Sequence, residues 1–268
     1  MRFIAKQTEE QNQLRSVTWG QWGTIGPHFL KANQEIASFA QVKHALVTFS
    51  ASAALETVLR GKNIGFGDCV AVADWSDPID AMTVAAVGAT PLFVGCGTQE
   101  GLSVSHLGDL TVKAVVADYP CDVAALSAYC KEKNIYFILN LGDTWGAKQH
   151  GEPIGRLADA CVVDMSQGCT LDLGLCGCVL TDSQEDFDLF YAYHNCGRPM
   201  GDGATLTFDA IVGGDLRVAE FQASMIPLQL AQLAPLTAAS EVSAKRERAG
   251  MAKAPFFQSD YFKKLTTE

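Results

Sequence analysis

Carboxylate side chains recur just beyond the short apolar runs of this sequence, where they could act together on a ligand. They are Asp77, Asp143, Asp164 and Asp215. Such a set could bind a divalent cation, because Ca²⁺ and Mg²⁺ take oxygen ligands, or it could bind an amine. The simpler interpretation, which we favour, is that these carboxylates are solvated or hydrogen-bonded remnants of an emptied cleft. We therefore predict no metal site.

Cysteine and histidine offer two further kinds of chemistry. Cys169 could act as a nucleophile, but no histidine stands beside it to lower its pKa, so a small apolar filler is the simpler interpretation. Cys176, Cys178, His194 and Cys196 could be considered as zinc ligands. However, C-x-C followed at this distance by H-x-C matches no specific zinc-ligand spacing.

Composition limits the classes of partner. The chain has 268 residues, a formal net charge of -10, 48% hydrophobic and 19% charged residues, which is typical of a folded globular protein. So acidic a chain is a poor ligand for nucleic acids and anionic membranes, and we expect neither as a partner. No apolar stretch is long enough to span a bilayer, and the first ten residues lack the apolar core of a signal peptide, so we expect a cytoplasmic protein.

Short apolar strands alternate with helical patterns through the first 160 residues, and these elements must position the polar residues. The expected strands are 45–49, 69–73, 90–94, 113–117 and 136–139, and the expected helices are 52–62, 79–87 and 123–133. Strands rich in Val, Ile and Ala on both faces, alternating with helices, indicate an α/β fold with a mostly parallel central sheet and helices on both faces.

The alternation weakens after residue 160. The further elements expected are strands over 161–164 and 176–181, a helix over 183–194, and a helical region over 217–247 that is broken near Pro235. Residues 197–214 contain five glycines and are expected to form a long loop, a kind of segment that is often functional in a compact domain.

Four polar segments follow the expected strands. They are Phe49–Ser52, Asp74–Asp77, Asn140–Asp143 and Asp164–Cys169. Ligands of such α/β sheets bind beyond the carboxyl ends of the strands. We therefore expect these four segments to surround one cleft.

Seven motifs occur in a recognisable order along the chain. They are Phe39-Ala40 with Ser50–Glu56, Gly67–Val70, Gly88–Val94, Ile138–Gly155, Gly174–Thr181, His194–Arg198 and Arg217–Ala223. From about Gly20 to Leu233 these motifs resemble the DegT/StrS-type sugar aminotransferases, in order and nearly in spacing. The resemblance implies the large domain of fold-type I aminotransferases, pyridoxal phosphate as the family cofactor, and a reaction that aminates keto-sugars and cyclitols.

The resemblance also implies a division of the chain. We expect an N-terminal helical segment over 1–40 and an aminotransferase-like large domain over 41–234. A helical tail over 235–268 is expected in place of the family's small C-terminal domain, which would be largely missing.

Two departures from the family pattern fall on the reacting groups that the resemblance implies. The family's Schiff-base lysine corresponds to Cys169, and a thiol cannot replace an amine in that reaction. The aspartate that holds the pyridine nitrogen in its protonated form corresponds to Asn140, whose amide carries no charge.

Further departures fall on the positions that contact the ring and the phosphate. Asp77 stands where the family has an aromatic residue that stacks on the ring. Ala51 replaces the glycine of the phosphate-binding segment, although Ser52 keeps a hydroxyl at the expected helix start. Asp164 replaces a serine ligand, and Asp215 replaces the asparagine that reaches over from the neighbouring subunit. Carboxylates facing a dianionic phosphate should prevent it from binding.

The sequence therefore predicts a non-catalytic homologue of sugar aminotransferases that binds no cofactor. It would act as a dimer subunit, paired with itself or with a full-length aminotransferase, or as a ligand-binding module. One alternative is an enzyme with different, pyridoxal-phosphate-independent chemistry that uses Cys169 or the aspartates. The other is an active aminotransferase, if the alignment is out of register.

Overall fold

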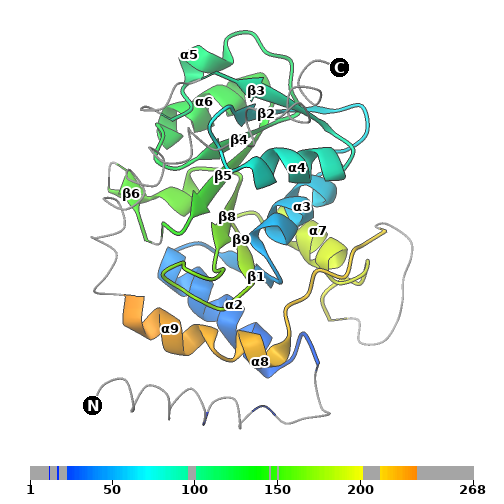
Figure 1. Ribbon diagram of the computed structural model, residues 1–268, viewed down its shortest axis with the longest axis vertical. Coiled ribbons are helices and arrows are strands. Elements are labelled where there is room, and N and C mark those ends of the chain that lie inside the picture. The colour runs from blue at the N-terminus through cyan, green and yellow to red at the C-terminus, as the bar shows by residue number, and fades with distance from the viewer. Residues whose placement is uncertain are drawn as a thin grey trace.

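The computed structural model describes residues 23–95, 101–144, 146–149, 151–201 and 212–233, together with Asn12 and Val17. These residues form a seven-stranded sheet with helices on both faces (Figure 1). The predicted α/β fold with a mostly parallel sheet is confirmed.

The strand order in the sheet is β1-β9-β8-β5-β4-β2-β3. The strands are β1 (His44–Thr48), β2 (Cys69–Ala73), β3 (Thr90–Val94), β4 (Ala114–Asp118), β5 (Tyr136–Gly142), β8 (Ala160–Asp164) and β9 (Gly177–Thr181). β9 runs antiparallel to both of its neighbours, β1 and β8, while the other neighbouring pairs are parallel. β1 and β8 therefore point the same way and end at the same edge of the sheet. A separate hairpin pairs β6 (Lys148–Gln149) with β7 (Glu152–Pro153).

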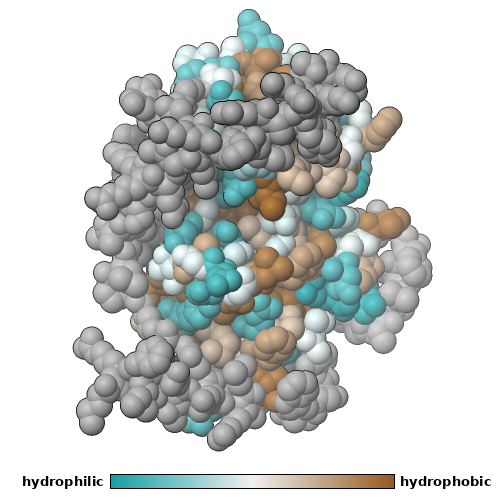
Figure 2. Space-filling view, viewed as in Figure 1, coloured by the Kyte–Doolittle hydropathy of each residue, from teal (hydrophilic) through white to brown (hydrophobic). Residues whose placement is uncertain are grey.

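The helices lie in two layers. They are α2 (Pro27–Ala40), α3 (Ala51–Gly61), α4 (Pro78–Ala86), α5 (Val104–Leu107), α6 (Val123–Lys133), α7 (Gln184–His194), α8 (Glu220–Ala223) and α9 (Ile226–Leu233), with a 3₁₀ turn, η1, at Ile154–Arg156. Figure 1 shows α3, α4 and α7 on one side of the sheet and α2, α5 and α6 on the other. On the face drawn in Figure 2, exposed apolar side chains occur in small groups among polar ones.

Capping residues set where several helices begin, and so fix the turns at the strand ends. The side chains of Ser50, Asp77, Asp122 and Ser183 accept hydrogen bonds from backbone N–H groups in the first turns of α3, α4, α6 and α7. These bonds satisfy donors that have no partner within the helix. Each helix therefore begins at a defined residue beside the sheet.

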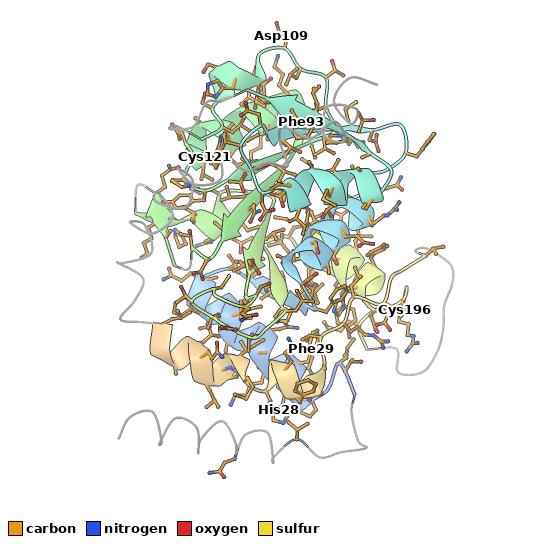
Figure 3. The ribbon with its side chains drawn as sticks, in the orientation of Figure 1. His28, Phe29, Phe93, Asp109, Cys121 and Cys196 are labelled. Atoms are coloured by element: carbon orange, nitrogen blue, oxygen red, sulfur yellow. The ribbon has the colours of Figure 1, made fainter. Side chains whose placement is uncertain are left out.

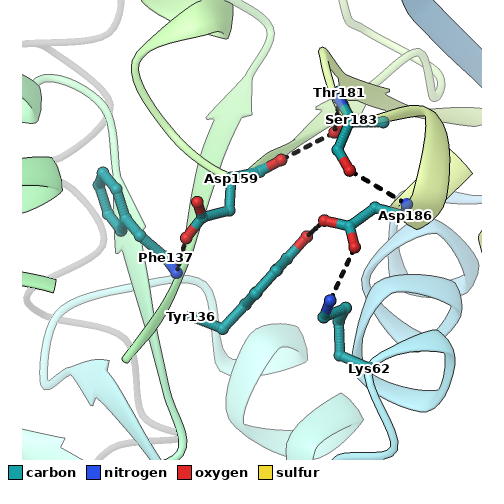
Figure 4. Close-up of polar contacts among 7 residues, drawn as sticks. All are labelled: Lys62, Tyr136, Phe137, Asp159, Thr181, Ser183 and Asp186. Atoms are coloured by element: carbon teal, nitrogen blue, oxygen red, sulfur yellow. Dashed lines mark hydrogen bonds and ion pairs between the residues drawn. The ribbon is translucent and has the colours of Figure 1, made fainter. Parts of the chain in front are cut away.

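A polar network ties the amino end of β5 to α3 and α7 (Figure 4). The carboxylate of Asp186 binds Lys62 Nζ and accepts from Tyr136 Oη, each at 2.7 Å. Lys62 Nζ also lies 4.9 Å from the centroid of the Tyr136 ring. Since Asp186 is buried, this pairing avoids an isolated charge in the core. The network lies at the amino end of β5, away from the edge that carries the polar segments, and serves to hold the fold.

The predicted elements agree well with the observed ones. The strands at 69–73 and 90–94 and the helix at 123–133 have the predicted bounds, and the other elements before residue 195 differ by at most three residues at either end. Such shifts are expected, because helix and strand ends are defined by single hydrogen bonds.

The helix predicted to start at Arg217 was wrong at its beginning. Arg217 and Ala219 form isolated bridges with Thr48 and Thr24, which hold this segment extended, and α8 begins only at Glu220. A break also separates α8 from α9 at residues 224–225. The predicted break at Pro235 and the predicted tail over 235–268 lie outside the described residues, as does most of the stretch before residue 23. No helix in the described part of the chain is long and apolar enough to cross a lipid bilayer.

Candidate functional site

The four polar segments lie along the same edge of the sheet. Thr48, at the end of β1, and Asp164, at the end of β8, are both paired with Gly177 of β9. At the ends of two neighbouring strands, Asp118 is paired with Asn140. This edge carries the residues expected around the cleft, because parallel strands bring their carboxyl ends together.

A buried pair of side chains, Asp80 and Asn140, lies at the centre of this edge. Asn140 Nδ2 donates to Asp80 Oδ2 at 2.9 Å, and Asn140 Oδ1 accepts from the backbone N–H of Gly142 at 2.9 Å. Asp80 is only 3% exposed. Burial, together with the charges of Asp77 and Asp164, raises the pKa of Asp80 to about 7, although the bond from Asn140 acts in the opposite direction.

Sequence reasoning did not single out Asp80. One signal was present, because an acidic residue three positions after Asp77 interrupts an otherwise apolar helical pattern. Asp77 itself is the N-cap of α4, and its Oδ1 accepts from the backbone N–H of Ile79 at 2.9 Å. The residue expected where the family stacks an aromatic ring therefore caps a helix.

Cys169 lies in the loop between β8 and β9, among carboxylates. Its thiol is half-buried, and burial together with the charges of Asp164 and Asp143 raises its pKa to about 12. A thiol with that pKa is protonated at neutral pH and is a weak nucleophile. This environment disfavours the covalent chemistry considered for Cys169.

Two aspartates of the predicted cleft fix the backbone of the Cys169 loop. Asp143 accepts from the backbone N–H of Thr170 at 2.8 Å and from its hydroxyl at 2.7 Å. Asp164 Oδ1 accepts from the backbone N–H of Ser166 at 2.9 Å. Both carboxylates are thus committed to holding the loop.

The start of α3 keeps part of the expected anion-binding geometry. Ser50 Oγ accepts from the backbone N–H of Ala53 at 3.0 Å and lies 3.0 Å from Ser52 Oγ. A Cβ atom at Gly177 would overlap the backbone of Ser50 and Ala51, so only glycine allows β9 to pass this close to the helix start.

Asp215 is engaged at a different place. Its Oδ1 accepts from Arg217 Nε at 2.7 Å, and this bond lowers the pKa of Asp215 below its usual range. The structure brings Asp77, Asp80, Asn140 and Asp164 together, and places Asp215 in an exposed ion pair of its own.

The zinc alternative finds no support in the described residues. There, no three His, Cys, Asp or Glu side chains lie close enough to hold a metal ion. The Cys176 thiol donates to the backbone carbonyl of Thr48 at 3.4 Å. His194 is fully buried at the end of α7, where its ring stacks on Phe29 with centroids 5.8 Å apart.

Comparison with known proteins identifies the fold and the lineage. The profile of the DegT/DnrJ/EryC1/StrS aminotransferase family matches residues 5–266. The chain belongs to this aminotransferase family. It is 24% identical over 236 residues to 3-amino-5-hydroxybenzoate synthase of Amycolatopsis mediterranei, covering 84% of this chain and 60% of that protein. It is 28% identical over 238 residues to L-glutamine:2-deoxy-scyllo-inosose aminotransferase of Streptomyces paromomycinus, covering 81% of this chain and 56% of that protein.

Solved structures confirm the predicted aminotransferase fold. The crystal structure of an aminotransferase from Psychrobacter cryohalolentis matches with a TM-score of 0.79 at 22% identity, covering 86% of this chain and 63% of that one. The DegT/DnrJ/EryC1/StrS chain described here thus spans about 60% of the length of the relatives that it matches first.

The residues at the site do not fit pyridoxal phosphate, the cofactor that the family implies. Where the resemblance places the Schiff-base lysine, the chain has a protonated thiol among carboxylates. Where it places an aspartate, the chain has an amide that is already bonded to Asp80 and Gly142. No reaction step through this cofactor follows from such groups.

Proposed function

We propose that this chain is a non-catalytic member of the sugar aminotransferases, one that neither binds pyridoxal phosphate specifically nor transfers an amino group. The observation that carries the proposal is the environment of Cys169. Its thiol stands where the resemblance implies the Schiff-base lysine, and its pKa is raised to about 12 by burial and by Asp164 and Asp143. A thiol cannot replace a lysine amine in Schiff-base formation, and this one is also poorly ionised.

The charge at this edge of the sheet supports the same proposal. Burial raises the pKa of Asp80, and Asp77 and Asp164 lie close enough for their charges to raise it further. A ligand with a dianionic phosphate would have to approach these carboxylates at short range, which costs several kcal/mol in a partly buried site. The hydroxyls at the start of α3 offer too little to offset that repulsion.

The role that we propose is that of a cytoplasmic subunit in amino-sugar biosynthesis. The resemblance implies dimers, so the chain would pair with a second copy or with a full-length aminotransferase. A partner could cover exposed apolar side chains. Among them are Phe49, Leu175 and Phe221, which are 38%, 56% and 53% exposed. Gln222 ties α8 to the segment before β9, because its Nε2 donates to the carbonyl of Leu175 at 2.6 Å.

A ligand-binding module is the second candidate. The acidic side chains at the strand ends favour an amine or another cation over an anion. Thermal unfolding in the presence of simple amines and amino-sugars tests this candidate. A rise in Tm that the Asp164→Asn substitution abolishes would support it, whereas an unchanged Tm with every compound would remove it.

The direct test of the proposal is titration of the purified protein with pyridoxal phosphate. Absorbance spectra are followed, the sample is reduced with borohydride, and the modified peptide is identified by mass spectrometry. We expect no saturable absorbance band and no adduct concentrated on one lysine. A stoichiometric adduct on a single lysine would overturn the proposal and restore the active aminotransferase as the best interpretation.

The partner is tested separately. Sedimentation or light scattering of the purified chain reports whether it pairs with itself. Co-expression with a full-length family member from the same genome, with a tag on one partner only, reports whether the two co-purify. Substitution of Phe221 by Ser should weaken whichever association is found, since this side chain is more than half exposed.

A further inference from the structure

We propose that Asp80 prevents position 140 from carrying the negative charge that the family's cofactor requires. We call Asp80 and Asn140 an exchanged pair. In this arrangement the carboxylate lies in the first turn of α4 and faces the amide of β5, at the position where the resemblance implies a carboxylate. The inference rests on the proposed function and deepens it, because it names the contact that keeps an uncharged side chain at position 140.

The bonding of Asn140 supports this exchange. Its Oδ1 must face Gly142, because a backbone N–H can only donate, and its Nδ2 therefore faces Asp80 Oδ2 at 2.9 Å. Both polar atoms of the amide are committed within the chain. The amide is thus held in place as the hydrogen-bond donor to a buried carboxylate.

An aspartate at position 140 would be incompatible with Asp80. Two carboxylates at hydrogen-bonding distance cannot both stay ionised, and such a pair must share a proton. The surroundings make this harder, because the charged groups that face Asp80 are Asp77 from its own helix and Asp164 from the end of β8. The amide at position 140, in contrast, donates a hydrogen bond to the carboxylate that the site already contains.

The test is a double-mutant cycle on stability, with no cofactor present. The variants are Asn140→Asp, Asp80→Asn and the double substitution, each unfolded by heat at pH 5 and pH 8. In the double variant the amide and the carboxylate have changed places, so the hydrogen bond can form again. Asn140→Asp should lower Tm strongly at pH 8, by roughly 5 to 10 °C, and much less at pH 5, where one proton can be shared. The double variant should recover most of the loss at pH 8.

Equal loss of Tm from Asn140→Asp in both backgrounds and at both pH values would overturn the inference. If Asp80→Asn cannot be purified folded, the single variant Asn140→Asp still decides the matter. Its urea midpoint should fall more steeply with rising pH than that of the unsubstituted chain, and parallel pH profiles would overturn the inference. A cofactor adduct in the unsubstituted chain would instead overturn the proposed function, so the two failures are distinguishable.

Discussion

Glu220 Oε1 accepts a hydrogen bond of 2.6 Å from the backbone N–H of Phe29, although 191 positions separate the two residues. The same carboxylate accepts from the N–H groups of Gly26 and His28, both at 3.1 Å. Three donors at the start of α2 are thus satisfied by one buried side chain from α8. Figure 3 shows His28 and Phe29 beside α8.

Substitution of Glu220 by Ala should therefore destabilise the protein. The change leaves three donors without a partner and removes a negative charge from a helix N-terminus, and we expect a loss of roughly 3 kcal/mol in the free energy of unfolding. Urea denaturation measures it. Glu35→Ala, on the exposed side of α2, is the matched control, since the ion pair of Glu35 with Lys31 is solvent-exposed. Similar losses for both variants would contradict this account of Glu220.

Gly177 should not tolerate a side chain. A Cβ there would overlap the backbone of Ser50. Neither β9 nor the start of α3 can easily move to relieve this overlap. We expect Gly177→Ala to cost roughly 2–3 kcal/mol of unfolding free energy. Gly23→Ala is the control, because no atom lies within 4 Å of the Cβ that would be added there. Thermal unfolding of the two variants should differ clearly, and equal Tm values would argue against the close approach of β9 to α3.

His194 should make stability depend on pH. Burial, followed by the charge of Arg217, lowers its pKa from 6.5 to about 3, so the folded state keeps this ring neutral. Because the pKa of His194 is lower in the folded than in the unfolded state, its contribution to the free energy of unfolding is fully present above pH 6.5. This contribution is lost progressively as the pH falls towards 3. The slope should approach about 1.4 kcal/mol per pH unit.

His194→Phe isolates this effect, because phenylalanine can keep the stacking on Phe29 without titrating. Unfolding free energies of both proteins are measured between pH 7 and pH 4. The difference between them should change with pH over this range. A constant difference would show that His194 does not titrate as described.

Restoring lysine at position 169 should not by itself restore cofactor binding. In Cys169→Lys the charges of Asp164 and Asp143 would favour the protonated form of the new amine, although burial, the largest cause of the raised pKa of Cys169, acts against it for an amine. A protonated amine is not a nucleophile, and Asn140 would still be bonded to Asp80. Borohydride trapping with pyridoxal phosphate should yield no adduct at position 169. A stoichiometric adduct there would mean that the lysine alone had been missing.

Much of the fold could be predicted from the sequence, because its strands are short apolar runs that are buried on both faces of the sheet. The strand 69–73 illustrates this, since both of its ends lie at the predicted residues. The extended form of residues 217–219 could not be predicted, because it depends on pairing with Thr48 and Thr24, which are remote in the sequence. At residues 217–219, tertiary contacts therefore outweigh the local helical pattern of the sequence.

The site was predicted in part for similar reasons. Asn140, Asp164 and Cys169 were singled out because each stands at or beyond the end of a predicted strand. Asp80 was missed because its significance depends on a contact with Asn140, which is 60 positions away. Asp215 was expected to reach the phosphate site of a neighbouring subunit, and this stays a prediction; within the chain its carboxylate forms an ion pair with Arg217.

The antiparallel position of β9 has a consequence for the order in which the chain can assemble. β1 is the edge strand of the sheet, and its only strand partner among the described elements is β9. Residues 44–48 thus complete their ladder only after residues 177–181 exist, roughly half the chain later. During synthesis at about 5–20 residues per second, β1 must wait about 7 to 27 seconds for its partner. The helix α2 packs on β1, and Asn33 Oδ1 accepts from the backbone N–H of Val47 at 2.9 Å. That contact occupies one backbone donor of β1 with which another chain could otherwise pair while β9 is still being made.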